Sequence, residues 1–123
     1  MEIFGIALGG AIGTVLRYAI QSGFKVWLGA SFPFGTMAVN LLGSLLIGLC
    51  AAGFEKNWPE LRPWVMTGFL GGFTTFSAFS LENFQFFREG RFVSLSINIG
   101  LGVFGGLVLA LAGFSWGRWI FSS

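Results

Sequence analysis

Residues 71–80 read Gly-Gly-Phe-Thr-Thr-Phe-Ser-Ala-Phe-Ser. The stretch lies midway through an apolar run of membrane-spanning length, yet it opens with two glycines and then gathers four hydroxyl groups and three phenyl rings. Backbone that faces lipid must have all its hydrogen bonds made, so a broken helix at membrane depth is tolerated only where protein or a water-filled path covers it. The stretch therefore predicts a helix that is broken in the membrane and a candidate site for an ion or a substrate.

The composition places the whole chain in a bilayer. Of its 123 residues, 54% are hydrophobic and 10% are charged, whereas soluble domains are about 25% charged. We expect one integral-membrane domain over residues 1–123. The absence of His and the single cysteine, Cys50, exclude an internal disulfide and a Cys/His metal site. The net charge of +2 is too small to indicate nucleic acid as a partner.

Four membrane spans are predicted, because each needs about 20 apolar residues. They are about Ile3–Ile20, Phe34–Phe54, Trp64–Phe87 and Phe92–Ile120. The segments between them hold most of the charges and all three prolines, and all five tryptophans fall at span ends, as an interfacial aromatic belt requires. Met1-Glu2 offers no basic segment, so we expect a retained first helix and not a signal peptide. The fold class is an all-α membrane protein of four helices, the third of them broken.

Small residues recur every four positions and so share one face of each helix. The stripes are Gly5, Gly9 and Gly13; Thr36, Asn40, Ser44 and Gly48; and Ser94, Asn98, Gly102, Gly106 and Ala110. Small residues let helix backbones approach closely, so the glycines are interpreted as packing seams. Asn40 differs, because an amide among apolar residues needs hydrogen-bond partners.

The basic residues show no bias between the two membrane faces. Lys56, Arg62 and Arg118 lie on the side of both termini, and Lys25, Arg88 and Arg91 lie on the other. Basic residues in short loops set orientation, and three against three makes no choice. The balance predicts insertion both ways round and an antiparallel, dual-topology homodimer. A chance balance is the alternative.

The residues favour a pore over an enzyme. There is neither His nor Asp, and no Ser has a nearby base. Phe76 and Phe79 are three residues apart and share a helix face, and the positive edge of each ring can solvate an anion weakly. With hydroxyls and the Asn40 amide as uncharged donors, an anion would bind tightly enough to enter and loosely enough to leave. Simple aromatic packing is the alternative.

The broken segment also suggests a cation site. Carbonyls freed at Gly71 and Thr74 have no amide partner, and unwound carbonyls hold small cations in other membrane folds. Alternatively, the hydroxyls of Thr74 or Thr75 fold back onto the backbone. Arg17 either snorkels to the interface or attracts anions in a vestibule, and Glu82 is either interfacial or paired with a buried donor.

At these residues the chain resembles the small fluoride channels called Fluc or CrcB. The matching pieces run from Gly9-Gly10 through Gly13 to Arg17-Tyr18, from Phe34-Gly35-Thr36 through Asn40 to Gly48, and from Gly68 through residues 71–80 to Glu82. Three such pieces in order on a short four-span chain are highly specific. The match covers nearly the whole length.

The resemblance implies an antiparallel homodimer with two pores that exports fluoride passively from the cytoplasm, in the inner or plasma membrane of a prokaryote. Its motif positions imply Phe76 and Phe79 as pore rings, Asn40 as pore amide, and Ser77 and Thr75 as hydroxyls of the same segment. Backbone carbonyls of Gly71 and Thr74 from both subunits would hold a structural Na⁺. Arg17 would match a basic vestibule residue, and Glu82 an acidic residue of supporting role.

The chain departs from many relatives at two places. Ala78 stands where they carry a hydroxyl, and the fourth-helix face reads Gly102, Gly106 and Ala110 where they carry polar groups. Two other functions compete with the channel. A small proton-coupled exporter would need a membrane carboxylate in the first helix, where only Glu2 stands at the very start. A purely structural membrane subunit would leave the cluster of donors and phenyl rings without a role.

Overall fold

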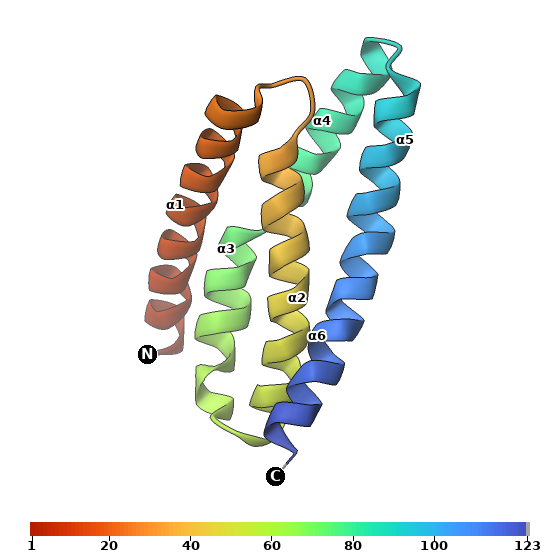
Figure 1. The fold of residues 1–123 in the computed structure, drawn as a ribbon. Helices are drawn as coiled ribbons and strands as arrows, with labels where there is room; N and C mark the ends of the chain where they lie inside the picture. The colour runs from red at the N-terminus through yellow and green to blue at the C-terminus, as the bar shows by residue number, and fades with distance from the viewer. Residues whose placement is uncertain (123) are drawn as a thin grey trace.

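The protein is seen in a computed structural model that describes residues 1–122, so Ser123 of the predicted domain lies outside the described residues. All regular elements are helical (Figure 1). In chain order they are α1 (Glu2–Leu28), α2 (Phe34–Lys56), η1 (Pro59–Leu61), η2 (Pro63–Leu70), α3 (Gly71–Phe73), α4 (Phe76–Arg88), α5 (Phe92–Gly100), η3 (Leu101–Gly105) and α6 (Gly106–Phe121). The short η1 is a 3₁₀ helix, and η2 and η3 are π-helical.

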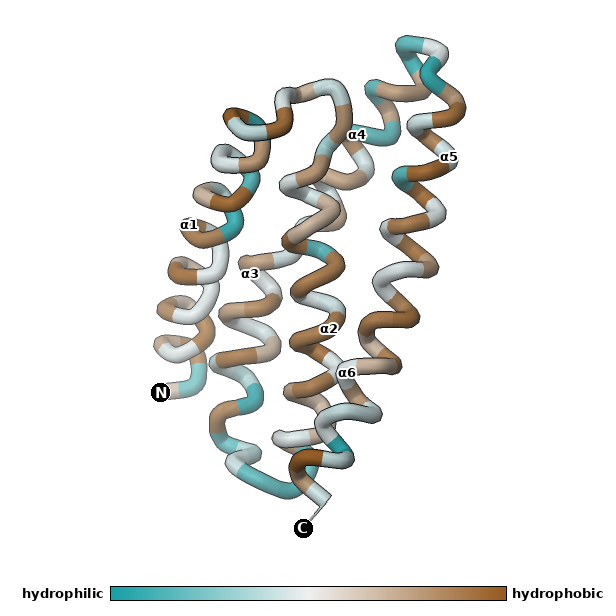
Figure 2. The backbone as a smooth tube through the Cα atoms, in the orientation of Figure 1, coloured by the Kyte–Doolittle hydropathy of each residue, from teal (hydrophilic) through white to brown (hydrophobic). Residues whose placement is uncertain are grey.

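Three of the helical stretches among residues 1–122 are long and apolar enough to cross a membrane: α1, α2 and the continuous run Phe92–Phe121. Figure 2 shows hydrophobic residues, in brown, along each of them. The predicted span Trp64–Phe87 is divided among η2, α3 and α4, so no single helix in it has the required length. That this divided segment crosses the membrane as one span stays a prediction.

Helix α1 continues to Leu28, beyond the predicted span end at Ile20. The predicted end marked where the apolar run gives way to Gln21 and Ser22, but polar residues do not stop a helix. The helix stops before Gly29, whose φ of 81° lies in the left-handed region that glycine adopts without steric strain. The end of the helix is therefore set by the glycine, and the predicted edge of the apolar layer at Ile20 stays a prediction.

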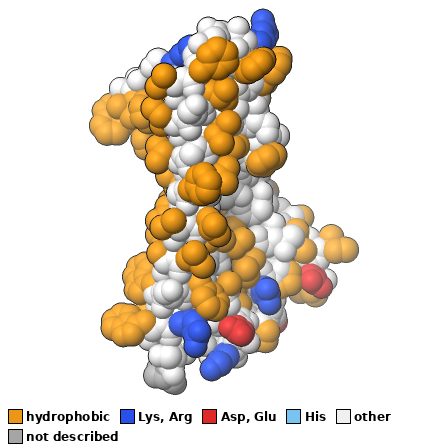
Figure 3. All heavy atoms as spheres, turned by 90° about the vertical axis from the view of Figure 1, so that its right-hand side faces the viewer, with side chains coloured by type: hydrophobic (Ala, Val, Ile, Leu, Met, Phe, Trp, Pro, Cys, Tyr) orange, Lys and Arg blue, Asp and Glu red, His pale blue; other side chains and the backbone are white. Residues whose placement is uncertain are grey.

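The two ends of the helical column carry most of the charged residues. Both termini and η1 lie at one end, and residues 29–33 and 89–91 lie at the other (Figure 1). Figure 3 shows charged side chains at these ends, with apolar side chains over the length between them on the face turned to the viewer. The arrangement agrees with an even number of crossings. The predicted insertion in two orientations is not tested by it.

The glycine stripes are packing seams, as predicted. Helix α2 packs mainly on α6, and α1 packs on η2 and α3. A Cβ added to Gly13 would collide with the carbonyl oxygen of Phe69, and one added to Gly48 would collide with that of Ala110. Backbone therefore meets backbone at these crossings. Next to them Val39, Leu70 and Phe73 form the buried core, which fixes the end of α3 against the first half of α2.

The seam can be tested by comparing two Gly→Ala substitutions. Gly48→Ala places its methyl group against the Ala110 carbonyl, and overpacking of this kind costs about 1–3 kcal/mol. Gly23→Ala is the control, because a Cβ there meets nothing within 4 Å and Ala is favoured over Gly in a helix by about 0.5–1 kcal/mol. Thermal unfolding in detergent should show a lower Tm for Gly48→Ala alone. Equal Tm values would contradict the backbone contact.

Candidate functional site

The helical path is interrupted between α3 and α4. Thr74 (φ −89°, ψ 157°) and Thr75 (φ −148°, ψ 113°) are both extended, and α4 begins at Phe76. The Thr74 amide still donates to the Leu70 carbonyl at 3.0 Å, but the extended backbone that follows carries the Thr75 amide out of the i to i−4 ladder. The interruption therefore needs other partners for its backbone groups. Its depth in a membrane stays a prediction.

Asn40 supplies two of those partners from α2. Its Nδ2 donates to the Thr75 carbonyl oxygen at 3.1 Å, and its Oδ1 accepts from the Thr75 amide at 2.8 Å. The side-chain amide thus pairs with Thr75 as a neighbouring strand would. Because an Asn amide has two donor hydrogens, one remains for another acceptor. The predicted need of Asn40 for hydrogen-bond partners is met by backbone.

Side chains cap both sides of the interruption. The Thr74 hydroxyl donates to the Leu70 carbonyl at 2.9 Å, and the Thr75 hydroxyl accepts from the Ala78 amide at 3.2 Å. The first bond is the folding back onto the backbone that the sequence left open as an alternative, and the second is an N-cap for α4. Arg17 reaches across from α1, where its Nε donates to the Gly72 carbonyl at 3.0 Å.

Two carbonyl groups in this segment remain without a partner. In a continuous helix Gly71 would accept from the Thr75 amide and Thr74 from the Ala78 amide. The first amide is bonded to Asn40 and the second to the Thr75 hydroxyl. Within residues 1–122 no hydrogen bond ends on either carbonyl oxygen. These are the two carbonyls that the sequence had suggested for a cation.

The interruption opens onto a cavity of about 410 Å³, here called the central groove. It is lined by Asn40, Gly43, Ser44, Ile47, Met66, Leu70, Gly71, Thr74, Thr75, Phe76, Phe79, Gly102 and Val103. Polar donors and phenyl rings thus share one space, and no charged residue lines it. The Ser77 hydroxyl lies 3.3 Å from that of Thr75 at its border.

The two predicted pore rings lie together but differ in surroundings. The centroids of Phe76 and Phe79 are 6.1 Å apart, with the rings tilted by 47°. Phe76 is 78% exposed, whereas Phe79 is only 8% exposed. One ring thus projects from the chain and the other packs into it.

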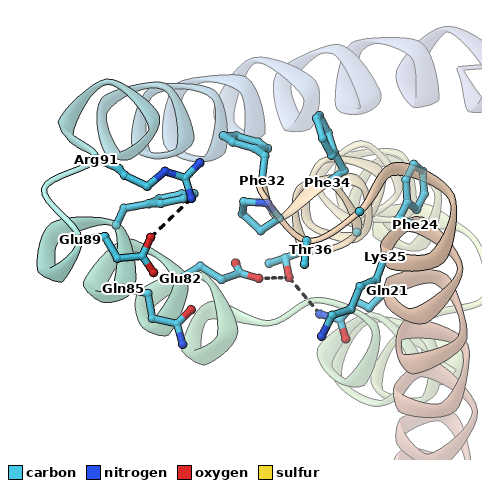
Figure 4. Close-up of a pocket in the computed structure, with 15 residues that line it drawn as sticks. Gln21, Phe24, Lys25, Phe32, Phe34, Thr36, Glu82, Gln85, Glu89 and Arg91 are labelled. Carbon is cyan, nitrogen blue, oxygen red and sulfur yellow. Dashed lines mark hydrogen bonds and ion pairs between the residues drawn. The ribbon is translucent and has the colours of Figure 1, made fainter.

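A second cavity, the polar pocket, lies at the end of the column away from the termini (Figure 4). Its volume is about 360 Å³. Inside it Gln21 donates to the Thr36 hydroxyl at 3.0 Å, and that hydroxyl donates to Glu82 Oε2 at 2.6 Å. Of the two readings of Glu82, pairing with a buried donor is the one observed. Its Oε1 is buried and has no hydrogen-bond partner within residues 1–122.

The rim of the polar pocket is held by Arg91. Its guanidinium donates to the Ser31 carbonyl at 2.7 Å and lies 3.6 Å from the Glu89 carboxylate, as the dashed line in Figure 4 marks. This ties the loop before α2 to the turn after α4. Arg17, the predicted vestibule residue, lines neither cavity.

Sequence reasoning located the central groove better than the polar pocket. Asn40, Thr75, Phe76 and Phe79 were all singled out, and they line one cavity. Gln21 was missed, because a lone polar residue past an apolar run carries no signal of its partner. Thr36 was seen only as one of a stripe, although its spacing of four from Asn40 already placed both on one face of α2.

The pairing of Asn40 with Thr75 predicts a stability loss for Asn40→Asp. A carboxylate keeps the acceptor but faces the Thr75 carbonyl without a donor, and an unsatisfied polar group costs about 1–3 kcal/mol. Asn57→Asp at the end of the same helix is the control, with an expected loss below about 1 kcal/mol. Thermal unfolding compares the two variants. A Tm unchanged in Asn40→Asp would rule out the paired geometry.

Comparison with known proteins gives a consistent result. Residues 4–114 match the family described as CrcB-like protein, Camphor Resistance (CrcB). The protein named Fluoride-specific ion channel FluC from Magnetococcus marinus is 43% identical over 123 residues, which cover 98% of this chain and 100% of that protein. Proteins of the same name from Vibrio vulnificus (41% identical, 89% of each chain) and Leptospira interrogans (46% identical, 88% of this chain and 87% of that one) are also similar. The chain belongs to the CrcB family.

Proposed function

We propose that this multi-pass membrane protein is a fluoride-selective channel through which cytoplasmic fluoride leaves a prokaryotic cell passively. The observation that carries the proposal is the central groove, which combines uncharged hydrogen-bond donors with two phenyl rings and has no charged lining residue. The similar proteins are named as fluoride-specific ion channels. A member of this family is a channel and not an enzyme.

The chemistry of the groove suits a small anion in transit. The Asn40 hydrogen that Thr75 does not use, the hydroxyls of Thr75 and Ser77, and the edges of Phe76 and Phe79 can each approach an anion. The start of α4 adds the positive end of a helix dipole at the same place. None of these groups carries a full charge, so an anion that loses its water is stabilised without being trapped.

Arg17 would act from outside the groove. Its Nε is bonded to Gly72, and its terminal Nη atoms make no hydrogen bond to residues 1–122. A cation held near the groove but outside its lining raises the local concentration of anions and leaves the narrow part uncharged. This is the vestibule role that the resemblance implied, combined with a cap on the broken helix.

The polar pocket would lie at one mouth of the path. Thr36 is four residues from Asn40 on α2, and Glu82 is three residues from Phe79 on α4, so each pair shares a helix face one turn apart. The two cavities therefore follow one another along these two helices. The hydrogen bond between Thr36 and Glu82 fastens α4 to α2 within the polar pocket, which would give Glu82 a supporting role.

A second, antiparallel copy of the chain would cover the groove. Gly71 and Thr74, which carry the free carbonyls, line the groove together with the exposed ring of Phe76, and free backbone groups cannot face lipid. The balance of basic residues, three at each end, permits the inverted copy. Each copy contributes one groove, so the homodimer would have two pores.

The same carbonyls fit a structural Na⁺ between the copies. No cluster of His, Cys, Asp or Glu that could bind a metal occurs within residues 1–122, so backbone oxygens are the candidate ligands. Two uncommitted carbonyls in one chain are few ligands for a cation, and an antiparallel partner would double their number to four. Bound there, the ion would neutralise the carbonyl dipoles and join the two broken helices.

Glu82 favours one competing function, a proton-coupled exporter. Such a protein needs a carboxylate inside the membrane, and Glu82 sits partly buried with a free oxygen in the polar pocket. Glu2, which the sequence offered for this role, is exposed at the start of α1. The two functions differ in whether fluoride moves alone or against a proton.

Purified protein in liposomes decides between them. With valinomycin to carry the countercharge and no pH gradient, we expect electrogenic release of fluoride and little release of chloride. Phe76→Ile should lower fluoride efflux while the protein stays folded, because the Phe76 ring is exposed and supports little packing. Phe84→Ile, an exposed ring on the same helix that lines neither cavity, is the control. Strict proton coupling, or no flux, would reject the channel.

The dual orientation is tested in cells. A reporter fused after residue 123 should be detected on both faces of the membrane, because the basic residues do not favour either orientation. Adding two lysines to the loop at residues 57–62 should shift the fusion toward the cytoplasmic face. A reporter found only on one face in the unmodified chain would contradict the antiparallel dimer.

A further inference from the structure

The ring of Phe79 rests against the backbone of Gly102, which lies in η3. A Cβ added to Gly102 would lie 2.6 Å from Cε1 and 2.8 Å from Cζ of Phe79. Carbon atoms in ordinary contact are about 3.5–4.0 Å apart. The ring therefore occupies the space that any other residue at position 102 would need. Both residues line the central groove.

The contact is specific to this position in the helix. Gly100, two residues earlier, has open space around it, and a Cβ on Gly105 would meet only the flexible end of Leu41 at 3.2 Å. Gly102 also lies in η3, the π-helical stretch Leu101–Gly105, and single π turns inside α-helices are frequent at functional sites. Among these glycines, the one in contact with a groove ring is Gly102.

The contact with Gly102 accounts for the difference in exposure between the rings of Phe79 and Phe76. Phe79 is 8% exposed and Phe76 is 78% exposed, although they lie one turn apart on α4. Phe79 is held by Gly102 of η3, whereas Phe76 makes no comparable contact with a glycine within residues 1–122.

We propose that Gly102 is a positioning residue for Phe79, and that the size of the residue at position 102 sets how far the Phe79 ring extends into the central groove. The inference rests on the proposed channel function. It also gives a reason for the missing polar group on the fourth helix. The Cβ of a hydroxyl-bearing residue at position 102 would displace the Phe79 ring. This chain therefore leaves space for the ring at that position, and its hydrogen-bond donors come from α2 and α4 instead.

The test compares Gly102→Ala with Gly100→Ala. To regain an ordinary separation the Phe79 ring must move by about 1 Å away from the added methyl group. We expect fluoride efflux from liposomes to fall about tenfold or more in Gly102→Ala, equivalent to about 1.4 kcal/mol of barrier. The ratio of fluoride to chloride efflux should change as well. Gly100→Ala should match the unmodified protein in both measurements.

Two results would overturn the proposal. One is a folded Gly102→Ala protein with unchanged efflux and unchanged selectivity, and the other is an equal loss in Gly100→Ala. The flux of the unmodified protein is measured first, and its absence would refute the channel function without bearing on the contact between Gly102 and Phe79.

A double-mutant cycle keeps the contact testable if Gly102→Ala folds poorly. Phe79→Leu removes the ring that the methyl group would meet, so the two substitutions should be less destabilising together than the sum of their separate effects. Thermal unfolding of the four proteins measures this coupling. Strictly additive effects of the two substitutions on stability would show that the Phe79 ring is not in contact with Gly102.

Discussion

The pairing of the Asn40 side chain with the Thr75 backbone is the interaction on which the rest of the site depends. By taking the Thr75 amide, Asn40 removes the donor that Gly71 would have used in a continuous helix. The same pairing holds Thr75 in an extended conformation, so that a new helix, α4, begins at Phe76. Together with the Thr75 hydroxyl, which takes the Ala78 amide, the pairing leaves free carbonyls on one side of the interruption and free amides at the start of α4. These are the two ends at which the proposed cation and anion would bind.

Much of this arrangement could be predicted from the sequence, because it depends on local chemistry. Two glycines followed by hydroxyl residues in an apolar run point to residues 71–80, and the four-residue glycine spacing points to the seams. What could not be predicted are contacts between distant parts of the chain. Arg17 meets Gly72 across 55 positions, and Thr36 meets Glu82 across 46. The spacing of residues along a helix does not indicate which distant hydroxyl will donate to a given carboxylate.

Position 102 illustrates the same limit. In the sequence Gly102 reads as one more small residue of a stripe, or as a missing polar group. In the structure the ring of Phe79 fills the space that a side chain at position 102 would take. A glycine can serve a site through the volume that it leaves empty, and that volume has meaning only once its neighbour is known.

The uncommitted carbonyls of Gly71 and Thr74 have a consequence for how a newly inserted chain associates and how long it persists. At the proposed membrane depth there is no water to satisfy them, so a lone subunit would be penalised before any apolar surface is considered. Association in the membrane would then be driven by relief of unsatisfied polar groups and not by the hydrophobic effect, which is weak between helices already in hydrocarbon. In the proposed pair, separation would expose those groups again, so subunits would exchange slowly and an unpartnered chain would be the form most open to degradation.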